Sequence, residues 1–130
     1  ASDELIALDL EDAQSKTLMN ADEAVLFIQR IKTRTGRYPV LYTNHASAKL
    51  ISATYKDSVF SHTPLWYARF KATVTDFPVG IWTTYMLWQF SSEIRLQRPV
   101  PGTKNDMDIN VYNGTPDQLK AAWPLTRMAP

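Results

Sequence analysis

Two carboxylates, Asp9 and Glu11, stand at alternate positions where an apolar run over residues 5–10 ends. Such a run predicts a strand buried on both faces, as in a parallel sheet. Side chains two apart on a strand share a face, so the two carboxyl groups are expected roughly 6–7 Å apart along the backbone. In α/β barrels the chemistry takes place at this end of the parallel strands. The alternative is a strand end that meets solvent, with Glu11 and Asp12 beginning a polar loop.

A second alternating pattern lies near the C-terminus. Asp106, Asp108 and Asn110 alternate with apolar residues, so the three polar side chains share one face of a predicted strand. If that face lines a barrel, a third acid converges with Asp9 and Glu11. The alternative is an edge strand whose polar face is solvated.

Aromatic residues stand near the ends of the predicted strands: Tyr42, Trp66, Trp88 and Phe90. Tryptophan and tyrosine in a cleft form flat apolar platforms with a polar edge, which suit sugar rings as well as aromatic ligands. The alternative is that these rings belong to the core. Gln89 is expected on the opposite face from Trp88, because neighbours on a strand alternate.

Other chemistry finds little support. His45 and His62 have no second histidine at ligand spacing, so a zinc site is not expected. The absence of cysteine excludes disulfides, thiolate nucleophiles and cysteine metal sites. No G-x-S-x-G elbow or glycine-rich phosphate loop is present among the four glycines. We expect no cofactor.

The composition is that of one globular domain. The chain has 130 residues, 45% of them hydrophobic and 21% charged, with a net charge of +1. Basic residues are scattered, apart from a cluster at the end of a predicted helix, so a nucleic-acid partner is not expected. No apolar run reaches 18 residues, so no membrane span is predicted.

Helix signals are clear at three places. Asn20 and Glu23 form a capping box, and Gly36 provides a stop. Asn44 can cap a second helix and Thr115 a third. The first part of the chain then has the β-α-β-α order of a parallel sheet, whereas residues 71–84 show no helical period. Strands are predicted at 5–10, 40–43, 64–70, 85–91 and 107–112, helices at 21–35, 45–53 and from 116 onward, and a loop at 56–63.

Several short blocks are similar, in order, to one enzyme family. They are Leu-Asp-Leu-Glu at 8–11, Val-Leu-Tyr-Thr-Asn at 40–44, Pro-Leu-Trp-Tyr-Ala-Arg-Phe at 64–70, and Trp-Gln-Phe-Ser at 88–91 with Asp-Ile-Asn-Val-Tyr at 108–112. Each block alone is weak, but their order and spacing are specific. The sequence resembles the glycoside hydrolase family 25 lysozymes, the Chalaropsis-type muramidases of bacteria, phages and some fungi.

The resemblance implies an α/β fold of the TIM-like irregular (β/α)5(β)3 type, in which five β/α units precede three strands with little helix between them. The five predicted strands would be the fourth to the eighth of that barrel. A full barrel needs about 200 residues or more. Residues 1–130 would therefore form a single partial catalytic domain. Its open edges could pair with a missing N-terminal half or with a second copy.

The resemblance also implies hydrolysis of the β-1,4 bond between N-acetylmuramic acid and N-acetylglucosamine in peptidoglycan, outside the cell or in its envelope. Glu11 would be the general acid, Asp9 would assist, and Asp108 would complete an acidic floor. The sugar groove would be lined by Tyr42, Trp66, Trp88 and Gln89. Two alternatives stay open: a catalytically incomplete fragment or glycan-binding scaffold, and a chitinase-like barrel glycosidase.

Overall fold

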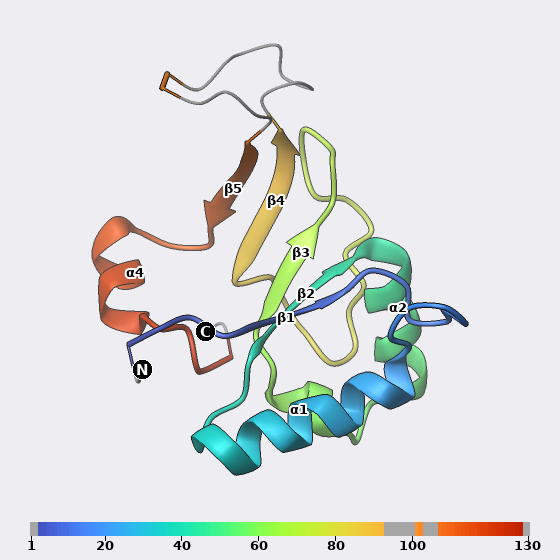
Figure 1. Cartoon of the computed structure of the whole chain (residues 1–130). Coiled ribbons are helices and arrows are strands. Elements are labelled where there is room, and N and C mark those ends of the chain that lie inside the picture. The colour runs from blue at the N-terminus through green and yellow to red at the C-terminus, as the bar shows by residue number, and fades with distance from the viewer. Residues whose placement is uncertain (1–2, 93–100, 103–106, 129–130) are drawn as a thin grey trace.

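A five-stranded sheet in the order β1-β2-β3-β4-β5 organises the molecule (Figure 1). The computed structural model describes residues 3–92, 101–102 and 107–128. The first four strands are parallel, and the fifth pairs antiparallel with the fourth. Within the described residues the sheet is open, with β1 and β5 at its edges. The strands are β1 (Ala7–Leu10), β2 (Val40–Asn44), β3 (Leu65–Ala68), β4 (Leu87–Ser92) and β5 (Asp108–Tyr112).

The α/β class is therefore confirmed, and each strand lies where the sequence predicted it, often shortened by a residue or more at an end. β3 in particular occupies Leu65–Ala68 rather than the predicted 64–70. The place of these strands in a barrel stays a prediction.

Helix α1 (Ala21–Thr35) begins and ends at the predicted signals. The Asn20 side chain accepts from the Glu23 backbone N–H at 3.0 Å, and the Glu23 carboxylate accepts from the Asn20 N–H at 3.4 Å. Gly36 follows with φ of 79°, a left-handed conformation that glycine adopts without steric cost. The predicted capping box and stop are confirmed.

The other helices follow the same rule. Helix α2 (His45–Thr54) begins after Asn44, whose side chain accepts from the Ser47 N–H at 2.9 Å. Helix α4 (Pro116–Ala122) begins after Thr115, which forms a second capping box. The predicted loop at 56–63 contains a short 3-10 helix, η1 (Val59–His62). No helix forms at 71–84, as predicted.

Helices α1 and α2 and the η1 turn cover one face of the sheet, which we call the helix-covered face. The prediction that β1 is buried on both faces is wrong: Leu8 and Leu10 are buried, whereas Ala7 and Asp9 are exposed. The helices cover only one side of the strand, so alternate side chains remain open on the other. The largest members of the core on the covered side are Leu10, Ile28, Leu41, Ile51, Phe60, Leu65, Tyr67 and Trp82.

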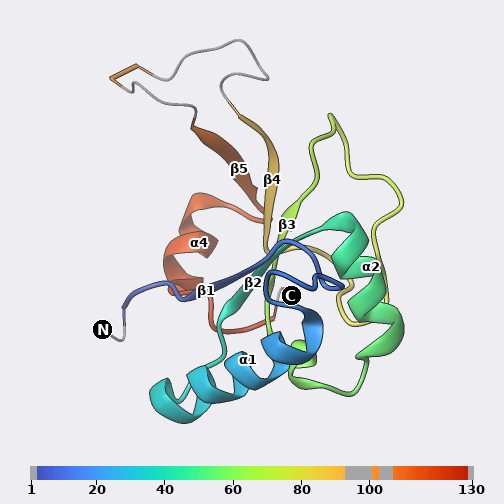
Figure 2. The ribbon, with the colours of Figure 1, turned by 45° about the vertical axis from the view of Figure 1, so that its right-hand side comes forward.

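The opposite face, which we call the inner face, is closed at only one end. Helix α4 lies on this side, across the sheet from α2 (Figure 2). Leu125, which follows α4, is buried against Val40 and Met86 near the N-terminal ends of the strands. The Trp123 indole N–H donates to the Asp3 carbonyl at 2.8 Å and joins the two ends of the chain.

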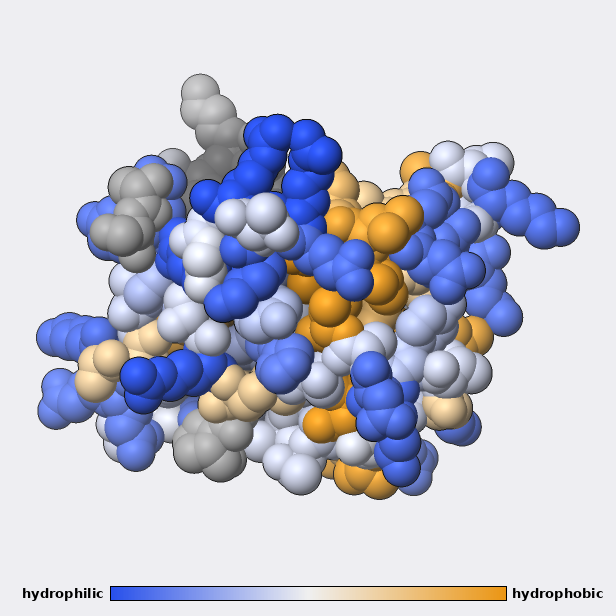
Figure 3. Space-filling model, turned by 90° about the horizontal axis from the view of Figure 1, so that it is seen from below, coloured by the Kyte–Doolittle hydropathy of each residue, from blue (hydrophilic) through white to orange (hydrophobic). Residues whose placement is uncertain are grey.

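The face of the molecule seen from below is predominantly hydrophilic (Figure 3). Seen from below, an apolar band crosses the middle of the molecule between charged and polar side chains (Figure 3). Leu26 and Phe27 of α1 are among the exposed apolar residues. In the described part of the chain, no helix has the length and apolar character needed to cross a membrane.

Candidate active site

Asp9 and Glu11 lie together at the C-terminal end of β1. Both line a small cavity of about 230 Å³, which Leu18 and Met19 complete from the following loop. The Asn44 side-chain amide donates to the Glu11 carbonyl at 2.5 Å and fixes the end of the strand. The predicted pairing of the two acids is present in the structure, although Glu11 lies just beyond the last residue of β1.

Leu18 and Met19 are site residues that the sequence did not single out. Their loop is held in shape because the buried Ser15 hydroxyl accepts from the Leu18 N–H at 2.7 Å. The Ala13 N–H donates to the Ser47 hydroxyl at 3.0 Å, which attaches the loop to α2. Leu18 is nevertheless 61% exposed. A loop residue is not part of a periodic sequence pattern. Leu18 is therefore identified as a site residue only by its position beside Asp9 and Glu11 in the structure.

The charge of Glu11 acts on the neighbouring Asp9 carboxyl. Partial burial, and then the negative charge of Glu11, raise the pKa of the Asp9 carboxyl above its ordinary value.

Tyr42 lies among the carboxylates. It is the register partner of Asp9 across β1 and β2, and the two side chains share the inner face. Burial raises the pKa of the Tyr42 phenol, followed by the negative charges of Asp108, Asp9 and Glu11. The structure thus brings β1 and β5, the two edges of the sheet, within electrostatic reach of one phenol. Asp106, the other predicted acid, lies outside the described residues.

Trp66 continues the inner face beside Tyr42. The two rings meet edge to face, with centroids 5.2 Å apart. The Trp66 indole N–H donates to the Asn110 side-chain oxygen at 2.7 Å, reaching over β4 to β5. The Tyr42 hydroxyl similarly donates to Gln89, reaching over β3 to β4. Gln89 therefore shares a face with Tyr42 and Trp66.

Trp88 lies on the other side of the sheet. Its register partner on β3 is Tyr67, a fully buried core residue. The Trp88 indole N–H donates to the Arg69 carbonyl at 2.8 Å, and its ring contacts Phe90 at a centroid distance of 5.4 Å. The expectation that Trp88 lines the groove with Tyr42 is wrong. Alternation placed Trp88 and Gln89 on opposite faces correctly, but only the register shows which one faces inward.

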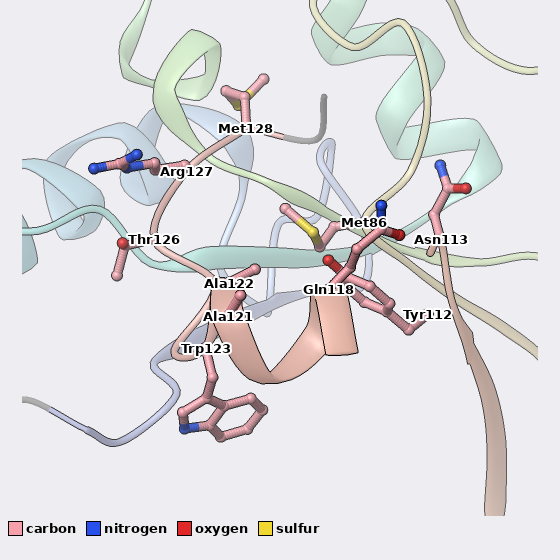
Figure 4. A pocket seen from close by; sticks show the side chains of 10 residues that line it. All are labelled: Met86, Tyr112, Asn113, Gln118, Ala121, Ala122, Trp123, Thr126, Arg127 and Met128. Carbon is pink, nitrogen blue, oxygen red and sulfur yellow. The ribbon is translucent and has the colours of Figure 1, made fainter. Parts of the chain in front are cut away.

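A separate cavity of about 550 Å³ lies between α4, the end of β5 and the C-terminal segment (Figure 4). Met86, Tyr112, Trp123 and Met128 line it together with amide and small side chains, and Arg127 is its charged member. No carboxylate among the described residues lines this cavity, so it lacks the groups that acid catalysis requires.

The two histidines each contact a tyrosine, His45 through a hydrogen bond and His62 through ring stacking. His45 Nδ1 lies 2.6 Å from the Tyr67 hydroxyl, and His62 stacks on Tyr38 at 4.8 Å between centroids. Among the residues that the structure describes, no group of three or more histidine or acidic side chains could hold a metal ion.

The chain is similar to known proteins in both sequence and fold. The sequence profile described as glycosyl hydrolases family 25 matches residues 1–98. A muramidase from Acremonium alcalophilum superposes with a TM-score of 0.62 and 26% identity, over 88% of this chain and 53% of that one. A family GH25 lysozyme from Aspergillus fumigatus gives 0.60 and 21%, over 88% and 54%. No curated protein matches.

The chain spans about half the length of these solved structures. The profile match covers well over half of the chain itself, and the mixed α/β sheet resembles that of the family's lysozymes. The chain therefore belongs to glycosyl hydrolases family 25.

Proposed function

We propose that this chain is the C-terminal part of a muramidase that cleaves the β-1,4 bond between N-acetylmuramic acid and N-acetylglucosamine in peptidoglycan. The observation that carries the proposal is that Asp9 and Glu11 line one cavity at the end of β1, where Asp9 is the register partner of Tyr42. These groups lie on the open part of the inner face, where the parallel strands end. Family membership and the likeness to a fungal muramidase support the same activity.

Glycoside hydrolysis needs a proton for the leaving oxygen and a group that stabilises the oxocarbenium-like centre. Glu11 donates that proton. Asp9 stabilises the positive centre by orienting the N-acetyl group of the substrate, a route that lies outside the usual scheme of two carboxylates. Asp108 adds negative potential from the other edge of the sheet.

The sugar rings lie against Tyr42 and Trp66, whose edge-to-face contact presents an aromatic surface beside the acids. Leu18 and Met19 supply an apolar wall next to Asp9 and Glu11, of the kind that accepts an acetamido methyl group. Such a groove combines apolar surface with a few placed polar groups.

The five strands are proposed as the fourth to the eighth of an irregular (β/α)5(β)3 barrel, with residues 1–130 as one partial catalytic domain. Its substrate places the enzyme outside the cell or in the cell envelope. An N-terminal half, or a second copy of the chain, would pair with the open edges of β1 and β5.

A second candidate is that the isolated chain binds glycan without cleaving it. It is favoured by the observation that the chain spans about half the length of the muramidase that it resembles. The chitinase-like alternative has no comparable support, because the family match is to glycosyl hydrolases family 25.

The substitution Glu11→Gln tests the acid. It keeps the shape of the side chain and removes the transferable proton, so we expect kcat to fall by about 10²–10⁴-fold. The readout is reducing sugar released from purified peptidoglycan, by the full-length gene product and by the 130-residue chain separately. Turnover by the chain alone, dependent on Glu11, would reject the binding-only candidate.

Asp12→Asn is the matched control. Asp12 is the neighbouring exposed acid, and its side-chain oxygen accepts from the Gln14 N–H at 2.9 Å, a bond that asparagine retains. We expect wild-type activity from this variant and unchanged unfolding midpoints from both. Full activity in Glu11→Gln would exclude Glu11 as the proton donor.

A further inference from the structure

Gln89 is a buried polar residue beside the open part of the inner face. It is 3% exposed, whereas Tyr42 and Trp66 beside it are only partly buried. A buried amide is costly unless it is hydrogen-bonded. The Gln89 side-chain oxygen accepts a hydrogen bond from the Tyr42 hydroxyl. Gln89 is too enclosed to present its amide to a sugar, so its partner Tyr42 is the route by which it can act.

The register explains why Gln89 and Tyr42 meet although β3 separates their strands. Ala68 is the register partner of Gln89 on β3, and its methyl group leaves room above the sheet. The Tyr42 phenol reaches diagonally across that space. The Tyr42 ring also contacts Trp66 edge to face. Two neighbours therefore hold the Tyr42 side chain in place: Trp66 contacts its ring and Gln89 accepts from its hydroxyl.

The direction of the Tyr42 hydroxyl matters because of what surrounds it. Asp9 is its cross-strand partner, and Asp108 and Glu11 also act on it. A phenol has one proton to donate and lone pairs that accept. Because the Gln89 side-chain oxygen accepts the hydrogen bond from the Tyr42 hydroxyl, the lone pairs of the Tyr42 oxygen remain available to the site. It can then accept from a protonated carboxyl group or from an N–H or O–H of the substrate.

We propose that Gln89 is a positioning residue, which holds the Tyr42 hydroxyl as a hydrogen-bond acceptor beside Asp9 on the inner face. This role replaces the direct substrate contact expected from the sequence, and it rests on the proposed muramidase function. Gln89 contributes to turnover only through Tyr42.

The test compares Gln89→Leu, Tyr42→Phe and the double variant in the full-length gene product. Loss of one positioning hydrogen bond should lower kcat by about tenfold, with a smaller change in KM. Because both residues act through the same phenol, the double variant should lose no more than the worse single one. A merely structural role predicts instead that Gln89→Leu lowers kcat further in the Tyr42→Phe background, and that result would overturn the proposal.

A structural readout separates this inference from the proposed function. In protein labelled with ¹³Cζ-tyrosine, the Tyr42 signal, assigned by its loss in Tyr42→Phe, should shift in Gln89→Leu. Ser91→Ala, a change at another buried position of β4, should leave both that signal and kcat unchanged. A shifted signal in a protein without muramidase activity would reject the function and retain the positioning contact. An unshifted signal overturns the proposal whatever the activity.

Discussion

The two faces of the sheet use the same strands for opposite purposes. On the helix-covered face, Leu41, Leu65 and Tyr67 are at most 1% exposed and pack in a continuous apolar core. On the inner face, their neighbours Tyr42 and Trp66 stay partly exposed and make polar contacts. Successive residues on a strand alternate between the faces, so one residue of β2 supports the fold and the next lines the site.

The inner face itself divides along the strands. Near their N-terminal ends, Leu125 and helix α4 close it with an apolar cluster around Val40 and Met86. Toward their C-terminal ends it is open and carries the acids. The open part of the inner face is therefore not an apolar core surface that lacks its cover. Its side chains are polar and form hydrogen bonds with one another.

Leu41→Ala should give the largest loss of stability, because it empties a fully buried position between the sheet and its helices. Large-to-small changes in a core cost about 2–5 kcal/mol, which combines lost transfer free energy with a cavity. Urea unfolding of the 130-residue chain measures this loss of stability. Asp108→Ala on the inner face is the control with which Leu41→Ala is compared.

Asp108 is exposed on β5, so its removal should change the free energy of unfolding by no more than about 0.5 kcal/mol. A cost comparable to that of Leu41→Ala would mean that the inner face also supports the fold, and the division of labour between the faces would be wrong.

The helices and strands were predictable because each has local signals. The capping box at Asn20 and Glu23, the Gly36 stop and the caps at Asn44 and Thr115 are satisfied within a few residues of sequence. The acid pair was equally visible, since alternation alone brings Asp9 and Glu11 to one side. Local geometry needs no knowledge of the tertiary arrangement.

The errors concern which face looks inward. Alternation along the strand correctly predicts opposite faces for Trp88 and Gln89, yet the family resemblance implies that both line the groove. The register with Tyr67 turns Trp88 toward the core. The position of Leu18 likewise depends on a loop that Ser15 holds in shape. The contact of Asn110 with the site depends on a hydrogen bond from Trp66 across β4. These are long-range or loop contacts, which a periodic pattern does not encode.

Asn44 links the helical layer to the site, because its oxygen caps α2 while its amide group holds the Glu11 carbonyl. Asn44→Ala removes both contacts and should lower the free energy of unfolding by about 1–2 kcal/mol, largely through the lost cap. Thermal unfolding of the chain measures this effect.

Asn44→Asp separates the two contacts. Aspartate keeps an oxygen for the Ser47 N–H but has no amide to donate to Glu11. We expect it to restore most of the stability lost in Asn44→Ala. If it is as unstable as the alanine variant, the link to Glu11 rather than the cap carries the energy, and the site would be coupled to the fold more strongly than the two-face comparison implies.

A small effect is expected in the pH dependence of stability at Asp9. Its pKa is raised in the folded chain above the ordinary value of 3.8 by burial and by Glu11, so the folded state holds this proton to higher pH than the unfolded state. The contribution of the Asp9 proton to folding stability is complete below the pKa of Asp9 in the unfolded chain. It is lost as pH rises through the pKa of Asp9 in the folded chain.

Asp9→Asn should therefore match the wild type near pH 2.5 and be more stable at pH 7. The gain should stay below about 1 kcal/mol, because Asp9 is exposed and solvent screens its charge. Urea unfolding at both pH values measures it, and 1 M salt should reduce the part due to Glu11. A wild type that is favoured more at pH 7 than at pH 2.5 would show that the ionised Asp9 is stabilised in the fold. Holding the acids together on the inner face would then not lower the free energy of unfolding.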